Sequence, residues 1–527
     1  MAENPPIRVG VFGWGIVAPK SPNIAAFKAN LASSETWLAP FNGFGPDNLL
    51  VGDPEFRFAD YRPWVEARFP PRRFQQLEEK ADLPAQYAIG AFIQGLCQNP
   101  GLERELQQLG TRAHVYVGTG IGSIGLYYDG SITLYHAQRR WDRFWAQPER
   151  NSALREFLAT PKDHRETEVP ANPETIFVES EEREATEQAW SHYWAARSPE
   201  LQSYLDELAQ IENLSVEGEV ETAKLRVIRE KERLHAKLQK KWGAPEPPWM
   251  VSANLIWNIH NGPAAQISML GKITGLSFAP VAACSTFGVA LRLAMNAIRS
   301  GEAKAVVVGA TDPPPHPLVV GAFYSARVIS ANRSVSVPLT HLRGTHVSGG
   351  SVVWIVGDFE YMKSKGFKPI GMEPLGVGLS SDAHHIITPT LEGPRTAILE
   401  ALADAQVTPE TVGTWDLHAT GTPGDFSEIS CLRTVFPDSV LVTARKGTFG
   451  HGMGAGGGWE LTAQYLGQEQ GQIFRTPLAR EEVNPSIGTV HDQFVFDADC
   501  KAPSGLAGKL SMGIGGINAC VISRPLR

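Results

Sequence analysis

The stretch that decides the fold is LSFAPVAACSTFGVALRLAMNAIRSG, residues 276–301. Its apolar start, 276–282, predicts a buried strand, and the rest predicts a helix that Gly301 closes. Cys284 stands at the turn between them, among small residues. There a helix N-terminus would lower the pKa of the thiol and could cradle an oxyanion. An inert core cysteine is the alternative interpretation of this residue.

Apolar and β-branched runs recur on both sides of this stretch. We expect helices over 22–32 and 81–96, a glycine-rich turn and strand at the C-terminus, and further strands at 7–13, 113–118, 304–309, 350–356, 369–378, 415–418 and 440–443. Strands that alternate with helices in this way predict an α/β protein built of layers.

The composition changes between about residues 138 and 247, which are rich in Glu, Arg, Lys, Gln and Trp. Leu201, Tyr204, Leu208 and Ile211 follow a 3-4-3 spacing, which is typical of a helical seam. Dense mixed charge over 217–241 predicts a long solvated helix, which the proline-rich GAPEPPW (243–249) ends. We expect an inserted helical arm. Its basic C-terminal part also suits docking to an acidic partner protein.

The overall composition is that of an ordinary globular protein. The chain has 527 residues, 43% of them hydrophobic, and a formal net charge of -8. Such a charge predicts no broad basic surface, and therefore neither nucleic acid nor an anionic membrane as a partner. The five cysteines form no CxxC pattern, which argues against a disulfide framework and a structural zinc site. With no visible leader and no long apolar run, we expect a cytoplasmic protein.

Two polar segments in the last third could carry chemistry. In DLHATGTPGDFSE (416–428), His418 ends a predicted strand, and two threonine hydroxyls follow it. Such a histidine can polarise a bound ligand, although a structural histidine is the alternative. In ARKGTFGHGMGAGGG (444–458), Lys446 and His451 lie five residues apart in a predicted glycine-dense loop. Glycine lets a backbone approach a ligand closely, whereas the alternative is a flexible loop.

Nucleotide-binding loops are not expected. The P-loop pattern is absent, and GIGSIG (120–125) satisfies GxGxxG after a strand. However, the following LYYDGSITLYH makes a poor first helix turn, which Gly130 interrupts. A nicotinamide site is therefore disfavoured.

Taken together, these segments resemble the β-ketoacyl synthases, condensing enzymes of the thiolase fold. VAACSTFGVAL resembles the family's nucleophile segment, LHATGTPGD its first histidine motif, and RKGTFGHGMGAGG its lysine–histidine motif. VGVFGWGIVAP, HVYVGTGIG, SSDAHHIITP and MGIGGINACVI resemble further family segments. The resemblance covers residues 7–125 and 249–527, with an arm of unusual length between them.

The resemblance implies a thiolase-like αβαβα fold made of two similar βαβαβ halves. The N-terminal half would span residues 1–365, including an insertion at about 126–247, and the C-terminal half would span 366–527. The resemblance also implies a homodimer.

The resemblance implies a Cys-His-His site as well. Cys284 would accept an acyl group from an acyl carrier protein or coenzyme A thioester. His418 and His451 would hold the carbonyl of a malonyl thioester while its carboxylate leaves, with Lys446 on the His451 side. Further residues would form the oxyanion hole (the backbone N–H groups of Cys284 and Ile514), bind substrate (Thr420, Thr422, His346, Gly515 and Gly516) or support the site (Asp425 and Glu428).

This implied site would carry out decarboxylative Claisen condensation in fatty-acid or polyketide biosynthesis. It would need no metal or cofactor beyond the thioester carriers. A non-decarboxylating thiolase or acyltransferase on the same fold, and a chain-length-factor-like partner subunit, are the alternatives. A partner of that kind generally lacks the nucleophile, and a thiolase uses a second cysteine.

Some residues depart from the family's pattern. TPGD is one residue short, which affects the placement of Asp425 and Glu428. Ile514 replaces a usual phenylalanine, His346 replaces another, and Gly350 replaces a glutamate. Because His346 is more polar than phenylalanine, we expect it to change the acyl pocket. The primer would then be short, polar or aryl, or a coenzyme A thioester.

Overall fold

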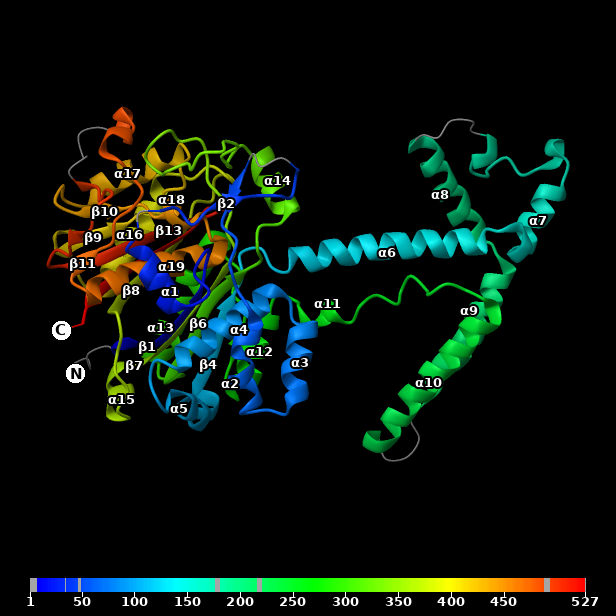
Figure 1. Ribbon diagram of the computed structural model, residues 1–527, viewed down its shortest axis with the longest axis horizontal. Coiled ribbons are helices and arrows are strands. Elements are labelled where there is room, and N and C mark those ends of the chain that lie inside the picture. Colours follow the sequence, from blue (N-terminus) through cyan, green and yellow to red (C-terminus); the bar gives the residue numbers. More distant parts are fainter. Residues whose placement is uncertain are drawn as a thin grey trace. The chain divides into compact units, whose positions relative to one another are not determined.

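A computed structural model describes residues 7–33, 35–45, 49–175, 181–215, 220–487 and 493–526, without the side chains of 220–223. The chain divides into two compact units. The first combines Met1–Gly125 with Ile256–Arg527, and the second is Leu126–Leu255 (Figure 1). The helical insertion predicted from the change in composition is therefore a unit of its own.

The first sheet comes from the N-terminal half of the chain. Its strands, in spatial order, are β1 (Val9–Val17), β7 (Gly350–Asp358), β6 (Ala305–Asp312), β4 (Ala113–Gly118) and β5 (Ser277–Phe278). The pairs β6–β4 and β4–β5 are parallel, whereas β7 is antiparallel to both of its neighbours. Four of the five strands are buried along their whole length, which explains their near-continuous apolar sequences.

The second sheet comes from the C-terminal half. Its order is β10 (Leu441–Thr443), β9 (Val412–Asp416), β13 (Leu506–Gly513), β14 (Ile517–Pro525) and β8 (Met372–Ser381). The pairs β10–β9 and β9–β13 are parallel, and β14 is antiparallel to β13 and β8. Parallel pairing brings the end of β9, which precedes His418, level with the middle of β13.

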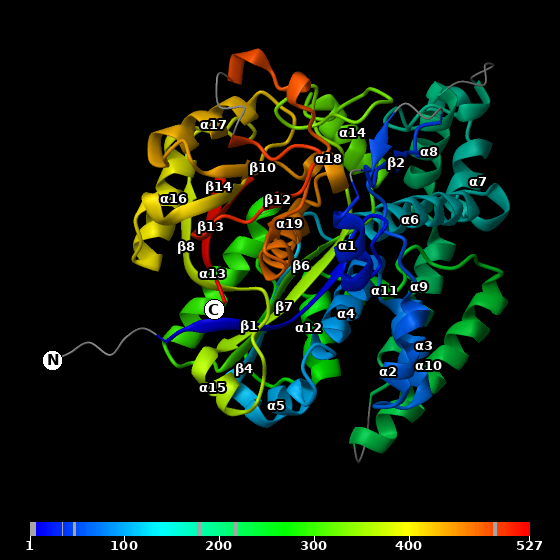
Figure 2. The ribbon, with the colours of Figure 1, turned by 60° about the vertical axis from the view of Figure 1, so that its left-hand side comes forward.

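Helices form the other three layers (Figure 2). Helices α13 (Thr286–Arg299) and α19 (Met453–Glu469) pack together and contact strands of both sheets. Outside the first sheet lie α4 (Leu83–Leu96) and α12 (Gly262–Gly271), and outside the second lies α16 (Glu392–Ala405), beside α17 (Gly424–Val435). The layers follow the predicted αβαβα order, and the largest hydrophobic cluster joins both sheets through the two central helices.

Shorter elements complete the first unit. They are α1 (Ile24–Leu31), α2 (Arg62–Glu66), α3 (Pro71–Lys80), α5 (Leu102–Leu109), α14 (Pro317–Ser325), α15 (Phe359–Ser364), α18 (Lys446–Phe449), β2 (Ala39–Pro40), β3 (Leu50–Val51), β11 (Gln472–Ile473) and β12 (Cys500–Lys501). Helix α11 (Asn254–Trp257) includes residues of both units.

The second unit is helical and has its own aromatic core. Its helices are α6 (Ile124–Trp145), which begins at the end of the first unit, α7 (Ser152–Ala159), α8 (Glu181–Ala195), α9 (Pro199–Glu212) and α10 (Val220–Trp242). Trp141, Trp145 and Tyr204 are buried in one cluster, and Trp190 and Trp194 in another. The predicted seam is confirmed: Leu201, Leu208 and Ile211 pack against the Tyr204 cluster. The predicted start of the charged helix, Glu217, lies outside the described residues.

Three predictions about local structure were wrong. Helix α6 runs through Gly130 without interruption, because one glycine costs only about 1 kcal/mol in a long helix. The predicted strand at 276–282 is only the two residues of β5, since Pro280 has no N–H for a ladder.

The glycine-dense segment after His451 is the start of α19 rather than a loop. Two of its glycines are required by packing. A Cβ atom on Gly458 would lie 2.4 Å from Val352 Cγ1, and one on Gly457 would lie 2.6 Å from Ser511 Oγ.

Candidate active site

Cys284 lies on a tight turn that leads into α13. A single turn of 3-10 helix covers Ala283–Ser285, and Ala283 has a left-handed φ of 47°. Such backbone strain is common at functional turns. The hydroxyl of Ser285 donates to the carbonyls of Ser511 (3.1 Å) and Ile517 (2.7 Å). These bonds tie the Cys284 turn to the β13–β14 turn, which carries Ile514.

The thiol of Cys284 is only 6% exposed, and its electrostatics differ from the prediction. Burial raises its pKa to about 11. The Ile514 backbone N–H, which donates to the sulfur, and the charge of Lys446 lower the pKa by less. The expected lowering of the pKa was therefore wrong, because desolvation outweighs the helix start. The thiol is protonated at neutral pH in the free chain.

His418 is held by two carboxylates of α17. The Glu428 carboxylate accepts from the backbone N–H groups of His418 (2.7 Å) and Ala419 (2.8 Å). Asp425 accepts from the N–H groups of Thr420 (2.8 Å) and Gly421 (3.2 Å). The shortened TPGD segment thus leaves both acids in contact with the histidine loop. Burial raises the pKa of Glu428 to about 7 and that of Asp425 to about 6.

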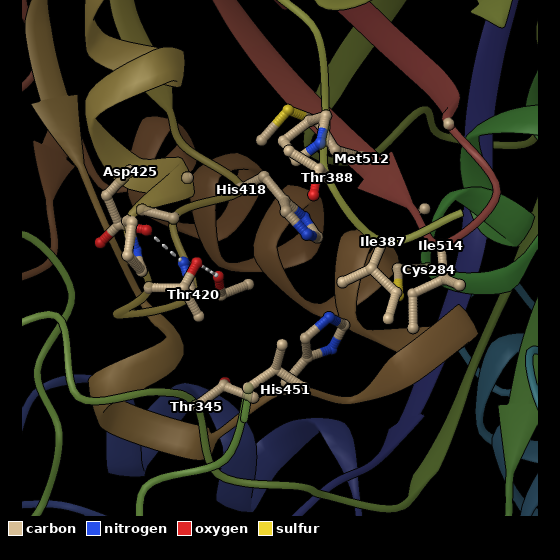
Figure 3. A pocket seen from close by; sticks show the side chains of 18 of the residues that line it. Cys284, Thr345, Ile387, Thr388, His418, Thr420, Asp425, His451, Met512 and Ile514 are labelled. Atoms are coloured by element: carbon tan, nitrogen blue, oxygen red, sulfur yellow. Dashed lines mark hydrogen bonds between the residues drawn. The ribbon is translucent and has the colours of Figure 1, made fainter. Parts of the chain in front are cut away.

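His451 lies between α18 and α19 and faces the same space. Its ring centroid lies 5.3 Å from that of His418, with the rings nearly perpendicular. In Figure 3 both imidazoles are directed toward the space beside Cys284. Residues from three distant parts of the chain therefore meet at one point.

The hydrogen bonds of the two imidazoles indicate one tautomer for both. The backbone N–H of Met453 donates to His451 Nδ1 (3.1 Å). The ammonium Nζ of Lys446, which can only donate, lies 3.5 Å from His418 Nδ1. Burial, followed by the charge of Lys446, holds the pKa of each histidine well below its usual value. Both rings are therefore neutral and carry their proton on Nε2, the tautomer that donates at that nitrogen.

Lys446 acts on both histidines. Its charge lowers the pKa of His451, in line with the predicted electrostatic role. Its ammonium also contacts His418 Nδ1 and forms a 2.6 Å ion pair with Glu460 of α19. The Lys446–Glu460 pair is buried on both sides. Lys446 therefore supports the first histidine of the pair directly.

A cavity of about 300 Å³ opens onto these groups. Cys284, His418 and His451 line it, together with Thr420, Thr422, Asp425, Ile514 and Gly516 among the predicted residues. The two threonine hydroxyls share a 2.9 Å hydrogen bond. Gly515 does not line the cavity; its N–H donates to the Ile386 carbonyl (2.7 Å), and its φ of 92° permits the turn.

His346 does not line this cavity, contrary to the prediction. Its Nε2 accepts from the Ser336 N–H (2.8 Å), and its Nδ1 donates to the Leu50 carbonyl (3.0 Å). Burial lowers its pKa to about 4, so the ring is neutral. The imidazole is a hydrogen-bond partner of two backbone groups and does not add polarity to the cavity. The expectation that His346 selects a different primer therefore loses its basis.

Gly350 also lies away from the cavity. A Cβ atom at this glycine would lie 2.2 Å from the Val17 carbonyl oxygen, and its φ is 140°. The close approach of β1 explains the glycine.

Several site residues were missed by sequence reasoning. Asp382, His385, Ile387 and Thr388 line the cavity from SSDAHHIITP, a segment that the sequence analysis left without roles. Asp312 was not singled out either, although it accepts from Thr119 Oγ1 (3.0 Å) and from the N–H groups of Ile121 (2.8 Å) and Gly454 (2.8 Å). Asp312 thereby ties the 119–121 turn to the start of α19.

Metal and membrane features are absent from the part of the chain that the structure describes. No group of three or more His, Cys, Asp or Glu there could hold a metal ion. None of the described helices is long and apolar enough to cross a membrane. All five cysteines are free thiols.

Comparisons with known proteins agree with this site. The model of the beta-ketoacyl synthase N-terminal domain matches residues 230–356, which include Cys284. The model of the C-terminal domain matches residues 373–478, which include both histidines.

Two curated relatives match at 30% identity. Over 222 residues the chain resembles Nodulation protein E of Rhizobium meliloti. The matched region is 41% of this chain and 55% of that protein. Over 237 residues it resembles the chloroplastic 3-oxoacyl-(acyl-carrier-protein) synthase I of Arabidopsis thaliana, with coverages of 43% and 48%. The chain spans about half the length of the curated relatives it matches.

Among solved structures, one neighbour is a type II polyketide synthase ketosynthase bound to a hexaketide, in complex with its acyl carrier protein. Its TM-score is 0.63 at 17% identity, over 99% of this chain and 100% of that chain. At this identity the likeness shows the fold. The models of both beta-ketoacyl synthase domains, matched in chain order around the cysteine and the histidines, and this shared fold make the chain similar to the β-ketoacyl synthases.

Proposed function

We propose that the protein is a β-ketoacyl synthase that joins a Cys284-bound acyl group to a malonyl thioester with loss of CO2. The observation that carries this proposal is the convergence of one buried thiol with two Nε2–H donors in a single cavity. A thiol alone would suit many acyl transfers. Two neutral imidazole donors add a site for an oxygen on which negative charge develops.

The first step is acyl transfer to Cys284. The sulfur attacks the carbonyl carbon of an acyl thioester, a new thioester bond forms, and the carrier thiol leaves with the proton that Cys284 gives up. The backbone N–H groups of Cys284 and Ile514 are the proposed donors to the tetrahedral oxyanion. Because the Cys284 thiol is protonated at neutral pH, proton transfer to the leaving sulfur is part of this step.

The second step joins the two acyl units. The carboxylate of the malonyl thioester leaves as CO2, and the electron pair of the broken bond stays on the thioester to form an enolate. The enolate oxygen accepts hydrogen bonds from the Nε2–H groups of His418 and His451. The enolate carbon then attacks the Cys284 thioester, the carbon–carbon bond forms, and the cysteine sulfur leaves as a thiolate, which takes up a proton from solvent. The two donors stabilise charge that exists only after decarboxylation begins, so they lower the barrier itself.

An acyl carrier protein is the proposed carrier of the thioesters, in fatty-acid or polyketide biosynthesis. The solved complex of a ketosynthase with its carrier supports this partner by analogy of fold. Thr420 and Thr422, which line the cavity, are the proposed hydrogen-bond partners of a pantetheine arm. The proposed chemistry uses only groups of the chain and the thioester substrates, and we place it in the cytoplasm, which suits five free thiols.

A homodimer through the first sheet is the proposed assembly. In the described chain β5 is an edge strand that pairs with β4 alone. The apolar side chains of Leu276 and Val281, beside this strand, are 50% and 56% exposed. Edge strands with exposed apolar neighbours favour pairing with another chain.

Product analysis tests the proposed reaction. The protein is mixed with an acyl thioester and then with malonyl carrier protein, and the carrier is weighed by mass spectrometry. We expect a β-ketoacyl carrier and one CO2 for each product. A β-keto product from two acyl thioesters without malonyl would indicate a thiolase. Acylated Cys284 without further product would indicate an acyltransferase. If no primer reacts, the protein would be a chain-length-factor-like subunit.

A further inference from the structure

A buried lysine lies in the middle of the second sheet, beneath the histidine pair. Lys509 is on β13, opposite Asp416 of β9, and its side chain is 1% exposed. A lysine is almost never fully buried without a charged partner, because desolvation of an ammonium is costly. A lysine at this depth therefore needs a reason that packing alone does not supply.

Lys509 shares one carboxylate with Lys446. Its Nζ forms a 2.9 Å ion pair with Glu460 Oε2, while Lys446 Nζ lies 2.6 Å from Glu460 Oε1. The Lys509 contact is ionic, without hydrogen-bond alignment at Oε2. The ammonium of Lys509 donates instead to the backbone carbonyls of Leu417 (3.4 Å) and Leu510. Leu417 directly precedes His418, so Lys509 contacts the histidine loop as well.

The charges around this carboxylate do not cancel. Lys446 and Lys509 face the single carboxylate of Glu460, which leaves one positive charge when all three groups are ionised. The neighbouring Arg445 and Asp416 neutralise each other in a buried 2.7 Å ion pair. A further buried carboxylate, that of Glu428, also interacts with Lys509, whose charge lowers the pKa of Glu428.

We infer that Lys509 is a positioning residue of the proposed condensation. By pairing with Oε2 of Glu460, it fixes the carboxylate whose Oε1 holds Lys446 beside His418 Nδ1. This inference rests on the proposed function. Because Lys509 pairs with Oε2, Lys446 contacts only Oε1 of the carboxylate. Its ammonium then remains beside His418 Nδ1, and the Nε2–H of that ring stays directed into the cavity.

The electrostatics of the cluster agree with this geometry. After burial and Lys446, the charge of Lys509 also lowers the pKa of both His418 and His451. The other groups with which these rings and Lys509 interact are Glu460, Asp416, Glu428 and Cys520. Removal of the Lys509 charge should therefore raise the pKa of both histidines.

Two substitutions separate charge from packing. Lys509→Met keeps the approximate volume and removes the charge, whereas Lys509→Arg keeps the charge and adds bulk. Lys304→Met is the matched control, because Lys304 forms a partly buried 2.5 Å pair with Asp358 in the first sheet. Each variant is assayed for acylation of Cys284 and for decarboxylation of malonyl carrier protein. Histidine ring resonances, assigned with His418→Gln and His451→Gln, are followed against pH by NMR.

For Lys509→Met we expect a loss of decarboxylation on the order of 10- to 10²-fold, because the histidine donor is misplaced, while acylation of Cys284 is nearly unchanged. Both histidines should titrate at higher pH than in the wild type. Lys509→Arg and Lys304→Met should keep the wild-type titration and the wild-type ratio of the two steps. Should Lys509→Met not fold, Lys509→Arg carries the test: titration of its histidines at the usual pH of a free histidine would overturn the inference.

Equal decarboxylation and equal titration in Lys509→Met and the wild type would also overturn the inference, as would a greater loss in Lys509→Arg than in Lys509→Met, which would indicate a packing role. If the wild type does not decarboxylate any malonyl thioester, the proposed function fails. The NMR titration still decides whether Lys509 controls the histidines.

Discussion

Cys284 combines a strained turn with a thiol whose pKa is raised to about 11 by burial. In the free protein its thiolate is therefore scarce at neutral pH. We therefore expect reactivity to depend on how a bound thioester is held against the sulfur. The Ile514 N–H and the turn that Ser285 fixes would hold it there, without a preformed thiolate. In the proposed reaction the two histidines act on the other substrate.

The raised pKa of Cys284 predicts a pH profile for alkylation. Since the thiolate is the nucleophile, the rate of Cys284 labelling by iodoacetamide should rise about tenfold per pH unit between about pH 7 and 10. Peptide mass spectrometry follows the labelling, with the exposed Cys97 as an internal reference. A plateau below pH 9 would show that the thiol pKa is lower than burial implies.

The resemblance to family motifs predicted that Cys284, His418 and His451 meet in one cavity, but not what surrounds them. Their proposed roles follow from that resemblance. Ser285, Glu460 and Lys509 act through contacts with residues far away in the chain, which no local pattern shows. The burial of Lys509 was foreshadowed only by a charge within the apolar run LAGKLSMG. His346 was misplaced because a resemblance gives the position in the chain and not the partners of the ring.

Helix α19 shows how packing overrides propensity. Four glycines near its start would favour a loop, yet the helix lies between two sheets, and close contact leaves no room for a side chain at Gly454, Gly457 or Gly458. The strands were easier to predict, because buried runs of β-branched residues strongly favour the strand conformation. Their ends were harder, as the short β5 shows.

Two substitutions in α19 test this explanation. Gly458→Ala should lower the free energy of unfolding by about 1–3 kcal/mol, because its Cβ would lie 2.4 Å from Val352 Cγ1. Gly456→Ala is the control, since the nearest atom to its Cβ is 4.0 Å away. There we expect no loss, and a gain of up to about 1 kcal/mol from helix propensity. Urea denaturation measures both, and equal effects would refute the packing explanation.

The division of the chain into two units predicts separable stabilities. Trp145 is 1% exposed in the aromatic core of the helical unit. Trp145→Ala should destabilise that unit by about 3–5 kcal/mol and leave acylation of Cys284 unchanged. Tryptophan fluorescence in denaturant and the mass of the acylated protein are the readouts, with the half-exposed Trp249→Ala as the milder control. A matching loss of acylation would mean that the helical unit shapes the active site.

The proposed homodimer can be tested at the edge of the first sheet. Leu276→Asp places a charge beside β5 and should shift the protein toward the 57.4 kDa monomer in light scattering. Leu399→Asp, on the exposed side of α16, should leave the mass unchanged. A monomeric wild type, or a dimer that survives Leu276→Asp, would place the interface elsewhere.

The central claim is that one cavity divides the reaction between a cysteine that carries the acyl group and two histidines that drive decarboxylation. Intact-protein mass spectrometry with a panel of acyl thioesters, followed by malonyl carrier protein, tests it most directly. The wild type should gain the mass of one acyl group and then release a β-ketoacyl product, whereas Cys284→Ala should gain none. His418→Ala and His451→Ala should still be acylated but condense about 10²- to 10³-fold more slowly. Acylation that persists in Cys284→Ala, or histidine variants that condense at the wild-type rate, would contradict the account.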